Sequence, residues 1–350
     1  MTTRINIAID VMGSDKGPET IIEASSISKT RYPEIRYTYF GNSKLISKYV
    51  KKYKNLINSY EIIHTDEEVL PEDKPSLALR KRKSTSMGRA LSFLKEKKVE
   101  ALVSAGNTGA LMAMSKLELR MLDGILRPAI AATFPHKKGE FVMLDLGANT
   151  ECSQENLFQF AVMGSEYAKV VLGKEEPKLA ILNIGTESDK GKIYINETAK
   201  NLEKSYLSKN FVGYIEGNNI VNGKVDVVIS DGFSGNIALK TAEGVAKLCS
   251  NYIKNIFESS FLGKISFLLL SKKLAALKDK LDPRKRNGAL FLGLNGIVVK
   301  SHGGADALSF ASAIDIAYEF AYEDIAKKII ENISKQNIEW LWKKTLQEIN

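Results

Sequence analysis

The sequence predicts an α/β fold built on a mostly parallel sheet. Short segments rich in Ile, Val, Leu and Ala alternate with longer segments of helical periodicity, which is the pattern of strand and helix units in such a sheet. Most of the apolar segments end in Gly, Asp, Ser or Asn, the residues expected where strands lead into ligand-binding loops. The chain of 350 residues is also long enough to bury about three-quarters of its unfolded surface in a core.

Six strands and six helices follow from this pattern. The strands are expected around Ile7, Tyr39, Leu102, Met143, Ile181 and Val227. The helices are expected over residues 19–29, 76–97, 109–121, 156–171 and 236–257, with a long C-terminal stretch beginning near residue 306. The basic segment 259–286 interrupts the alternation and is expected to form an inserted helical hairpin. Because no internal repeat and no Pro/Gly/Ser-rich linker divides the chain, we expect a single domain over residues 1–350.

Charge is the one unusual feature of the composition. The 50 Lys and Arg residues against 41 Asp and Glu give a formal net charge of +9, which favours an acidic protein, a phosphate compound, nucleic acid or an anionic membrane as partner without choosing among them. The two cysteines, Cys152 and Cys249, belong to no CxxC or Cys/His pattern, so neither a disulfide framework nor a metal site is expected. The first apolar run is too short for a signal peptide, and no run approaches the roughly twenty apolar residues that span a bilayer. We therefore expect a cytoplasmic protein.

The loop after the first predicted strand is a candidate anion site. It contains Asp10, Gly13 and Asp15, and Pro18 suits the first turn of the helix that follows. Its spacing matches neither GxGxxG nor GxxxxGK[ST]. A surface turn in which these residues only satisfy backbone geometry is therefore an alternative.

The segment SAGNTG is the best candidate for binding phosphate. Its small side chains let backbone N–H groups approach an anion at the positive end of a helix dipole, and two hydroxyls add further donors. The candidate residues are Ser104, Gly106, Asn107, Thr108 and Gly109. The alternative is a tight turn in which Asn107 or Thr108 caps the helix.

Further loops carry polar residues at predicted strand ends or helix starts. The candidate ligand-binding residues in them are Asn149, Lys190, Asp231, Gly235, Asn236 and His302. Asp145 also ends a strand, either as part of the site or as a buried carboxylate that accepts from loop N–H groups. His302 precedes two glycines. The alternative to a ligand-binding role is that His302 is a helix-entry residue bonded to the backbone. No Ser/His/Asp order and no GxSxG elbow is present.

The chain resembles the phosphate acyltransferases of the PlsX family in seven segments between Ile7 and Asp306. They are, in order, IAIDVMGSDKGP, SAGNTGAL, RPAIAATFP, LDLGAN, NIGTESDKG, ISDGFSGNIALKTAEG and SHGGAD. The resemblance implies a Rossmann-like α/β/α fold similar to isopropylmalate dehydrogenase and phosphotransacetylase. It also implies transfer of a fatty acyl group from acyl carrier protein to inorganic phosphate, giving acyl phosphate for phospholipid synthesis, by a homodimer without a cofactor.

Individual residues match this family to different degrees. The matching residues are Gly13, Asp15, Asn107, Lys190, Asn236 and His302. Ser14 and Lys16 stand where the family commonly has Gly and His, so no catalytic role is assigned to them. Glu151 and Ser153 stand where it more often has Asp and Lys.

The chemistry implied by this resemblance needs positioning more than a strong base. Phosphate is already anionic at neutral pH and the leaving thiol has a pKa near 8.5, so no covalent enzyme nucleophile is required. Holding phosphate against the thioester carbonyl is worth about 7–11 kcal/mol, and donors to the oxyanion add about 3 kcal/mol. We expect the amides of residues 106–109 to hold phosphate and Lys190 and Asn236 to stabilise the oxyanion. His302 is expected to orient phosphate or to deliver a proton to the thiolate.

Partners and alternative activities follow from the same features. An acidic acyl carrier protein fits the positive net charge. The segment 259–286 suits an acyl-chain groove, an anionic membrane surface, a dimer contact or two core-packed helices. The alternative activities are a phosphotransacetylase that uses a small acyl thioester and a dehydrogenase, which the missing dinucleotide fingerprint disfavours. A nucleic-acid-binding protein is a further alternative, but no motif of a known module is present and no nucleic acid is expected as partner.

Overall fold

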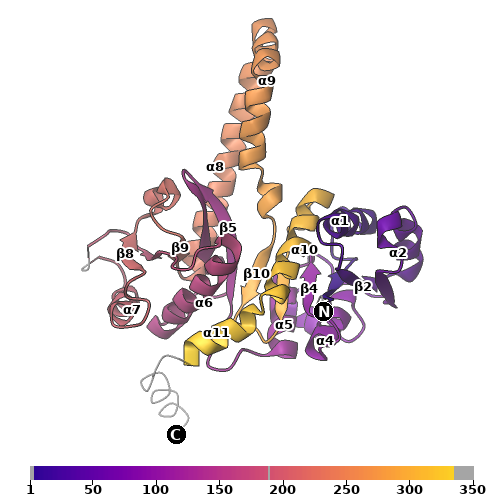
Figure 1. Ribbon diagram of the computed structural model, residues 1–350, viewed down its shortest axis with the longest axis horizontal. Helices are drawn as coiled ribbons and strands as arrows, with labels where there is room; N and C mark the ends of the chain where they lie inside the picture. The colour runs from indigo at the N-terminus through magenta and orange to yellow at the C-terminus, as the bar shows by residue number, and fades with distance from the viewer. Residues whose placement is uncertain (1–3, 188–189, 335–350) are drawn as a thin grey trace.

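The computed structural model describes residues 4–187 and 190–334, which contain one eleven-stranded sheet in the order β3-β2-β1-β4-β11-β10-β5-β6-β9-β7-β8 (Figure 1). The strands are β1 (Asn6–Asp10), β2 (Arg36–Gly41), β3 (Tyr60–His64), β4 (Ala101–Ser104), β5 (Ala129–His136), β6 (Gly139–Leu144), β7 (Leu179–Leu182), β8 (Phe211–Ile215), β9 (Val227–Ile229), β10 (Ala289–Leu292) and β11 (Ile297–Lys300). The helices are α1 (Pro18–Arg31), α2 (Ser43–Val50), α3 (Pro75–Arg80), α4 (Ser86–Lys95), α5 (Thr108–Leu119), α6 (Gln154–Leu172), α7 (Ile193–Glu203), α8 (Gly232–Glu258), α9 (Phe261–Leu281), α10 (Ala307–Tyr322) and α11 (Ile325–Ser334). Short 3-10 helices cover Lys54–Leu56, Gly217–Asn222 and Pro283–Arg286.

The sheet consists of two parallel halves that run in opposite directions. Strands β3, β2, β1, β4 and β11 form one half, β6, β9, β7 and β8 form the other, and the antiparallel pairings of β10 and β5 join them. Register partners cross the junction at one level, from Val103 to Val299, from Val299 to Leu290, and from Leu290 to Ala131. The next residue, Ala132, pairs with Met143, one residue before the end of β6. The carboxyl ends of β4 and β6 therefore reach about the same level of the sheet from opposite directions.

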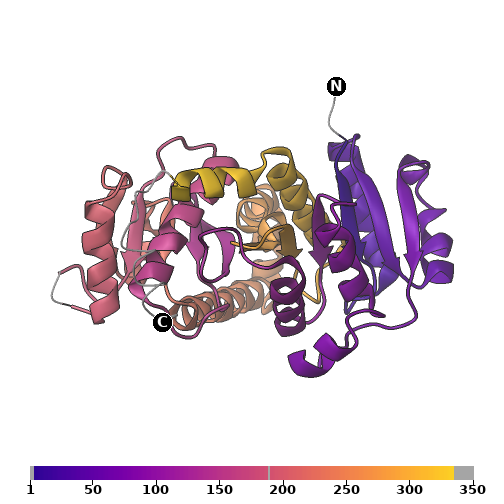
Figure 2. The ribbon, with the colours of Figure 1, turned by 90° about the horizontal axis from the view of Figure 1, so that it is seen from below.

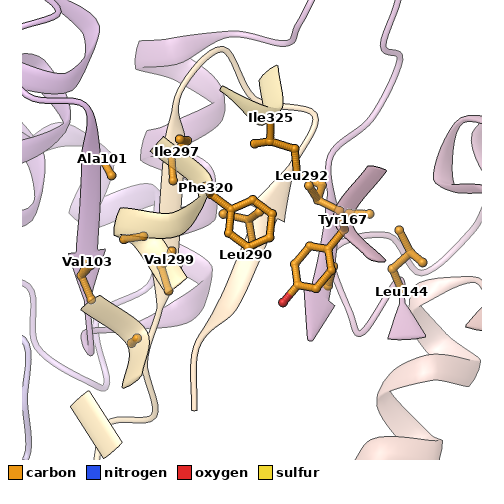
Figure 3. Packing of buried hydrophobic residues seen from close by; sticks show 14 of the residues in the cluster. Ala101, Val103, Leu144, Tyr167, Leu290, Leu292, Ile297, Val299, Phe320 and Ile325 are labelled. Atoms are coloured by element: carbon orange, nitrogen blue, oxygen red, sulfur yellow. The ribbon is translucent and has the colours of Figure 1, made fainter. Parts of the chain in front are cut away.

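Helices cover both faces of the sheet, and alternate strand residues point to the two faces. Ile7 and Ile9 belong to the core cluster that includes α1, α6 and α10, whereas Ala8 between them packs with α4 and α5. This period of two explains why the central strands are apolar throughout. In the first cluster, the rings of Tyr167 and Phe320 lie 4.8 Å apart between centroids (Figure 3). Helix α10 packs on α1 and α11 packs on α6, so the C-terminal helices hold the two halves together (Figure 2).

Most predicted elements are confirmed, and the differences have structural causes. The six predicted strands are β1, β2, β4, β6, β7 and β9. Of the strands that were not predicted, β3 and β8 are half-exposed and β5 contains a proline. Strands β10 and β11 are also unpredicted, although they are as long as the predicted β4 and β7. The C-terminal stretch divides between Tyr322 and Ile325, at Asp324 with a positive φ of 47°. Residues 335–350 lie outside the described residues.

The helix expected over residues 76–97 is wrong as a single element, because the structure contains α3 and α4 there. The chain turns between them, and Thr85 caps α4 by accepting a hydrogen bond from the Gly88 amide. A Cβ on Gly88 would lie 1.7 Å from the Arg82 carbonyl oxygen, so this close turn requires glycine. The periodicity of the sequence does not register such a contact.

Helices α8 and α9 project from the body of the molecule as an antiparallel pair (Figure 1). This pair is the predicted inserted hairpin, although the expected range 259–286 covers only its second arm, because the first arm is the outer part of α8. Its apolar side chains are exposed, with Phe261 at 78% and Leu269 at 79% of full exposure. None of the helices in the described part of the chain is long and apolar enough to cross a bilayer.

Candidate functional site

The carboxyl ends of β1 and β4 surround one buried carboxylate. Asp10, the last residue of β1, accepts hydrogen bonds from the hydroxyls of Ser86 and Ser104, both at 2.7 Å. Burial raises the pKa of Asp10, and these two hydrogen bonds oppose the rise. A Cβ on Gly13 would lie 2.7 Å from Asp10 Oδ2 and 2.8 Å from the Gly106 nitrogen. Asp10 therefore ties the first predicted loop to the second and does not present an unbonded carboxylate.

Asn107 holds the second loop in place through its side chain. Its Oδ1 caps α5 by accepting from the Ala110 amide at 3.0 Å. Its Nδ2 donates to the carbonyl oxygens of Pro71 at 2.8 Å and Asp73 at 3.0 Å. The capping alternative is thus confirmed for the Asn107 side chain, which leaves its backbone amide for a ligand.

The donors that this loop can offer are mainly backbone amides. The Ser104 hydroxyl donates to Asp10 and accepts from the Gly106 amide at 3.1 Å, so its proton is already in use. Within the described residues, the amides of residues 107–109 donate to no protein acceptor. These amides, together with the exposed Thr108 hydroxyl, form a group of converging donors at the N-terminus of a helix, which suits an anion.

Lys300, the last residue of β11, places a cation directly beside this loop. Its Nζ donates to the carbonyl oxygen of Ala105 at 3.1 Å and to that of Ser301. Burial lowers the pKa of Lys300 to about 8, against the opposing attraction of Asp15 and Asp10. Lys300 was not predicted from the sequence. The sequence feature that could have indicated it is a lysine at the end of the short apolar run IVVK. A residue at the end of a central strand is partly enclosed by its neighbours.

The loops after β1 and β11 contact each other, which brings two predicted residues together. The Asp15 amide donates to the Gly303 carbonyl oxygen at 3.0 Å. His302 is exposed, its amide donates to Asn287 Oδ1 at 3.1 Å, and its Nδ1 accepts from the Gly304 amide at 3.0 Å. Because Nδ1 is an acceptor, the neutral ring carries its proton on Nε2. His302 is therefore bonded to the backbone through Nδ1, as the alternative interpretation expects. Its Nε2 proton remains available to donate to a ligand.

The loop after β6 is organised by a second buried carboxylate, Asp145. Its oxygens accept from the amides of Ile130, Gly147, Ala148 and Asn149 at 2.8–3.1 Å. Burial raises the pKa of Asp145, and these amides oppose the rise. Asn149 Nδ2 donates to Asp145 Oδ2 at 2.9 Å and to the Pro128 carbonyl oxygen at 2.7 Å. The buried-carboxylate alternative is confirmed for Asp145, and both amide hydrogens of Asn149 are engaged inside the loop.

The N-terminus of α8 packs against this loop. A Cβ on Gly235 would lie 1.9 Å from the Asp145 carbonyl oxygen, so only glycine fits there. Asn236, which is exposed, lies beside Gly147: a Cβ on that glycine would be 3.5 Å from the Asn236 Cβ. Asn236 is therefore next to the loop that follows β6, as a donor to a bound oxyanion would have to be.

Asp231 caps α8 and is engaged on both oxygens. Oδ1 accepts from the Ser234 amide at 2.7 Å, and Oδ2 accepts from the Tyr194 hydroxyl at 2.9 Å. Burial, together with the hydrogen bond to Asp231, raises the pKa of Tyr194. Tyr194 was not predicted, and nothing in the segment KIYIN distinguishes it from a core tyrosine.

Lys190 lies in the loop between β7 and α7 and is exposed. Its carbonyl oxygen accepts from Asn183 Nδ2 at 3.2 Å, and a Cβ on Gly185 would be 3.0 Å from Lys190 Cγ. Within residues 4–187 and 190–334, no hydrogen bond or ion pair joins its ammonium to His302 or Asn236. The structure therefore places Lys190 beside the second half of the sheet, without a direct contact to the first.

The two sets of loops meet at a cavity of about 680 Å³, which we call the α5 trench. One end is polar and is formed by Thr108 and Gly109 from the loop after β4 and by Gly147 and Ala148 from the loop after β6. The walls are mostly apolar and consist of Leu79, Met112, Ala113, Leu117 and Ile130, with Lys116 beside them. Loops far apart in sequence therefore face one cavity, although Lys190 and His302 lie outside its lining.

Neither a metal cluster nor a reactive thiol stands near these loops in the described part of the chain. No group of three or more His, Cys, Asp or Glu side chains among the described residues is placed to hold a metal ion. Burial, with the nearby Asp145 carboxylate, raises the pKa of Cys152 to about 12. That thiol stays protonated at neutral pH and is a poor nucleophile.

Comparison with known proteins places this arrangement in a family. The family described as "Fatty acid synthesis protein" matches residues 5–328. The phosphate acyltransferase of Parvibaculum lavamentivorans is 47% identical over 336 residues, covering 96% of this chain and 93% of that protein. The phosphate acyltransferase of Paramagnetospirillum magneticum is 46% identical over 341 residues, covering 97% of each.

Solved structures of low sequence identity share the fold. A phosphotransacetylase from Streptococcus pyogenes aligns with a TM-score of 0.61 at 17% identity, covering 92% of this chain and 95% of the other. A branched-chain phosphotransacylase from Enterococcus faecalis V583 aligns with a TM-score of 0.55 at 13% identity, covering 91% and 99%. These alignments confirm the predicted phosphotransacetylase-like α/β architecture.

Proposed function

This chain belongs to the phosphate acyltransferase family, and from that membership we propose that it transfers a fatty acyl group from acyl carrier protein to inorganic phosphate. It is an acyltransferase, and the product is an acyl phosphate for phospholipid synthesis. One observation carries the proposal. The unbonded amides of residues 107–109 stand at the polar end of the apolar α5 trench, and the reaction needs an anion and an aliphatic chain at the same point.

Phosphate is proposed to bind at the loop after β4. The amides of residues 107–109 and the Thr108 hydroxyl supply neutral donors, and the Lys300 ammonium donates to the Ala105 carbonyl oxygen in the same loop. Because the ammonium is enclosed, its attraction for a bound anion is screened less than that of a surface lysine. Asp10 and Asp145 then act as positioning residues that fix the two loops.

The proposed reaction is a direct displacement at the thioester carbonyl. A phosphate oxygen forms a bond to the carbonyl carbon, the tetrahedral oxyanion collapses, and the carbon–sulfur bond breaks to release a thiolate. Asn236, beside Gly147, and Lys190 are proposed as donors to the oxyanion. The Nε2 proton of His302 is proposed to orient phosphate or to neutralise the thiolate.

Acyl carrier protein is proposed as the acyl donor because it is acidic and this chain carries a net charge of +9. The hairpin of α8 and α9 exposes apolar side chains to solvent, which is typical of an interaction surface. We propose that the chain forms a homodimer and that this hairpin contacts anionic membranes peripherally. Light scattering in solution tests the dimer. Co-sedimentation with anionic vesicles at low salt tests the membrane contact, and a Leu268→Glu, Leu269→Glu variant should remain in the supernatant.

The reaction is tested by mixing the purified chain with hexadecanoyl acyl carrier protein and phosphate. Hydroxylamine traps acyl phosphate, and a thiol reagent follows the released carrier thiol. We expect equal amounts of both products, and only when phosphate is present. Thiol release without acyl phosphate would contradict the proposal, and preferential use of acetyl thioester would favour the phosphotransacetylase alternative.

A further inference from the structure

We propose that the α5 trench holds the hydrocarbon tail of the acyl group and that Met112, Ala113 and Leu117 set the chain length that the enzyme accepts. This inference rests on the proposed function and adds to it the place of the acyl chain. It assigns a ligand of one chemical class, a long saturated chain, to a cavity of about 680 Å³.

The trench runs along one face of α5. Gly109, Met112, Ala113, Lys116 and Leu117 recur at spacings of three and four residues, which places them on the same side of a helix. The rise along the helix from Gly109 to Leu117 is about 12 Å. The cavity is therefore an open groove that follows one face of a helix, an arrangement that suits an extended chain.

The chemistry changes along this channel in the order that an acyl thioester requires. At one end stand the amides of Thr108 and Gly109, which have no protein acceptor among the described residues, and the loop after β6, whose amides donate to Asp145. Beyond them the lining is Met112, Ala113 and Ile130, which offer only apolar contacts. A thioester whose carbonyl lies at the polar end would therefore direct its tail along α5 toward Leu117.

Leu117 has no role in the core that would explain it. Its side chain is 50% exposed at the far end of the trench, next to Lys116. An apolar side chain at the open end of an apolar channel is expected where a ligand, and not the protein, completes the packing. Lys116 then marks the point at which the channel reaches solvent.

The tip of the hairpin is too distant to serve as the acyl groove. Helix α8 begins at Gly232, beside the loop after β6, and its 27 residues extend for about 40 Å. Helix α9 begins at Phe261, at the far end of α8, and then runs back along it (Figure 1). A chain whose carbonyl lies at the strand ends cannot also reach the exposed Phe261 and Leu262 at that tip.

Chain-length dependence tests the proposal. Ala113→Phe shortens the channel, and Leu117→Asp places a charge at its outer end. We expect each to lower kcat/KM for the hexadecanoyl thioester by about fourfold for every methylene that leaves the trench, while the butanoyl thioester, whose chain ends before Ala113, is used as by the wild type. Leu126→Asp is the matched control, because Leu126 is 46% exposed but does not line the trench, and it should leave the chain-length profile unchanged.

The outcomes separate this proposal from the proposed function. If Ala113→Phe and Leu117→Asp keep the wild-type profile for both chain lengths, or lose activity with both equally while remaining folded by circular dichroism, the trench does not hold the tail. In either case the wild-type enzyme would still form acyl phosphate. If the wild type forms no acyl phosphate from any thioester, the proposed function fails instead.

Discussion

Replacing Lys300 with methionine should separate the stability of the protein from its activity. Burial lowers the pKa of this ammonium from 10.5 to about 8, which corresponds to an unfavourable free energy of about 3 kcal/mol for keeping it charged in the folded state. The methionine variant escapes this cost at neutral pH. It also leaves the carbonyl oxygens of Ala105 and Ser301 without their donor, which costs about 1–3 kcal/mol for each unsatisfied group.

The pH dependence isolates the first of these effects. Between pH 8 and 10.5 the unfolded chain holds the Lys300 proton and the folded chain releases it, so the unfolded state binds more protons there. The free energy of unfolding of the wild type must therefore rise with pH in this interval, relative to the variant, by about 3 kcal/mol in total. The lost hydrogen bonds add an offset that does not have this slope.

Urea unfolding at several pH values between 7 and 10.5 measures this difference. The control is Lys247→Met, because Lys247 lies exposed on α8 and should unfold in parallel with the wild type throughout. We also expect Lys300→Met to lower kcat by about 100-fold, the effect typical of losing one donor to a reacting anion. Parallel stability curves for Lys300→Met and the wild type would refute the reasoning about burial, and wild-type turnover would remove Lys300 from the phosphate site.

Three further changes have definite expected outcomes. Gly235→Ala forces a Cβ to 1.9 Å from a backbone oxygen and should lower the free energy of unfolding by about 2–3 kcal/mol. Gly244→Ala, in open space on the same helix, should raise the free energy of unfolding by about 1 kcal/mol. Equal effects of the two substitutions in urea titrations would contradict the close packing at Gly235. Lys190→Ala and His302→Ala alter exposed side chains, so the free energy of unfolding should change by less than about 0.5 kcal/mol while acyl phosphate formation falls on the order of 100-fold. Unchanged rates in both variants would remove their proposed roles. The KM for acyl carrier protein should rise as salt screens the basic surface, and a KM that stays constant from low to high ionic strength would argue against an electrostatic docking surface.

Several parts of the site follow from short stretches of sequence. The loop SAGNTG is predictable because a strand end, small residues and a helix start are adjacent in the chain, and the structure has Asn107 capping α5 there. Gly13 and Gly235 were predicted as ligand-binding residues from their places next to strand or helix ends, and the structure has close backbone approaches at both. What these patterns did not distinguish was which polar groups are already satisfied, because the partners of Ser104 and Asn149 come from other parts of the chain.

Other parts could not be found in that way. Lys300 is one of 50 basic residues, and only its position at the end of β11, beside Ala105, makes it different from the rest. Tyr194 meets Asp231 across 37 positions of sequence. The α5 trench combines Ile130 with Met112 and Leu79, residues that periodicity assigns to separate elements.

Local residue order was thus sufficient for the class of fold, the central strands and the glycine-rich loops, because each depends on neighbours within a few positions. The meeting of those loops depends on the antiparallel strands β10 and β5, which reverse the second half of the sheet and bring the ends of β4 and β6 to one level. Strand register and the position of α5 relative to Ile130 and the loop after β6 are long-range properties. Only folding in three dimensions could therefore bring the loop after β4, the loop after β6 and the apolar side chains of α5 to one cavity.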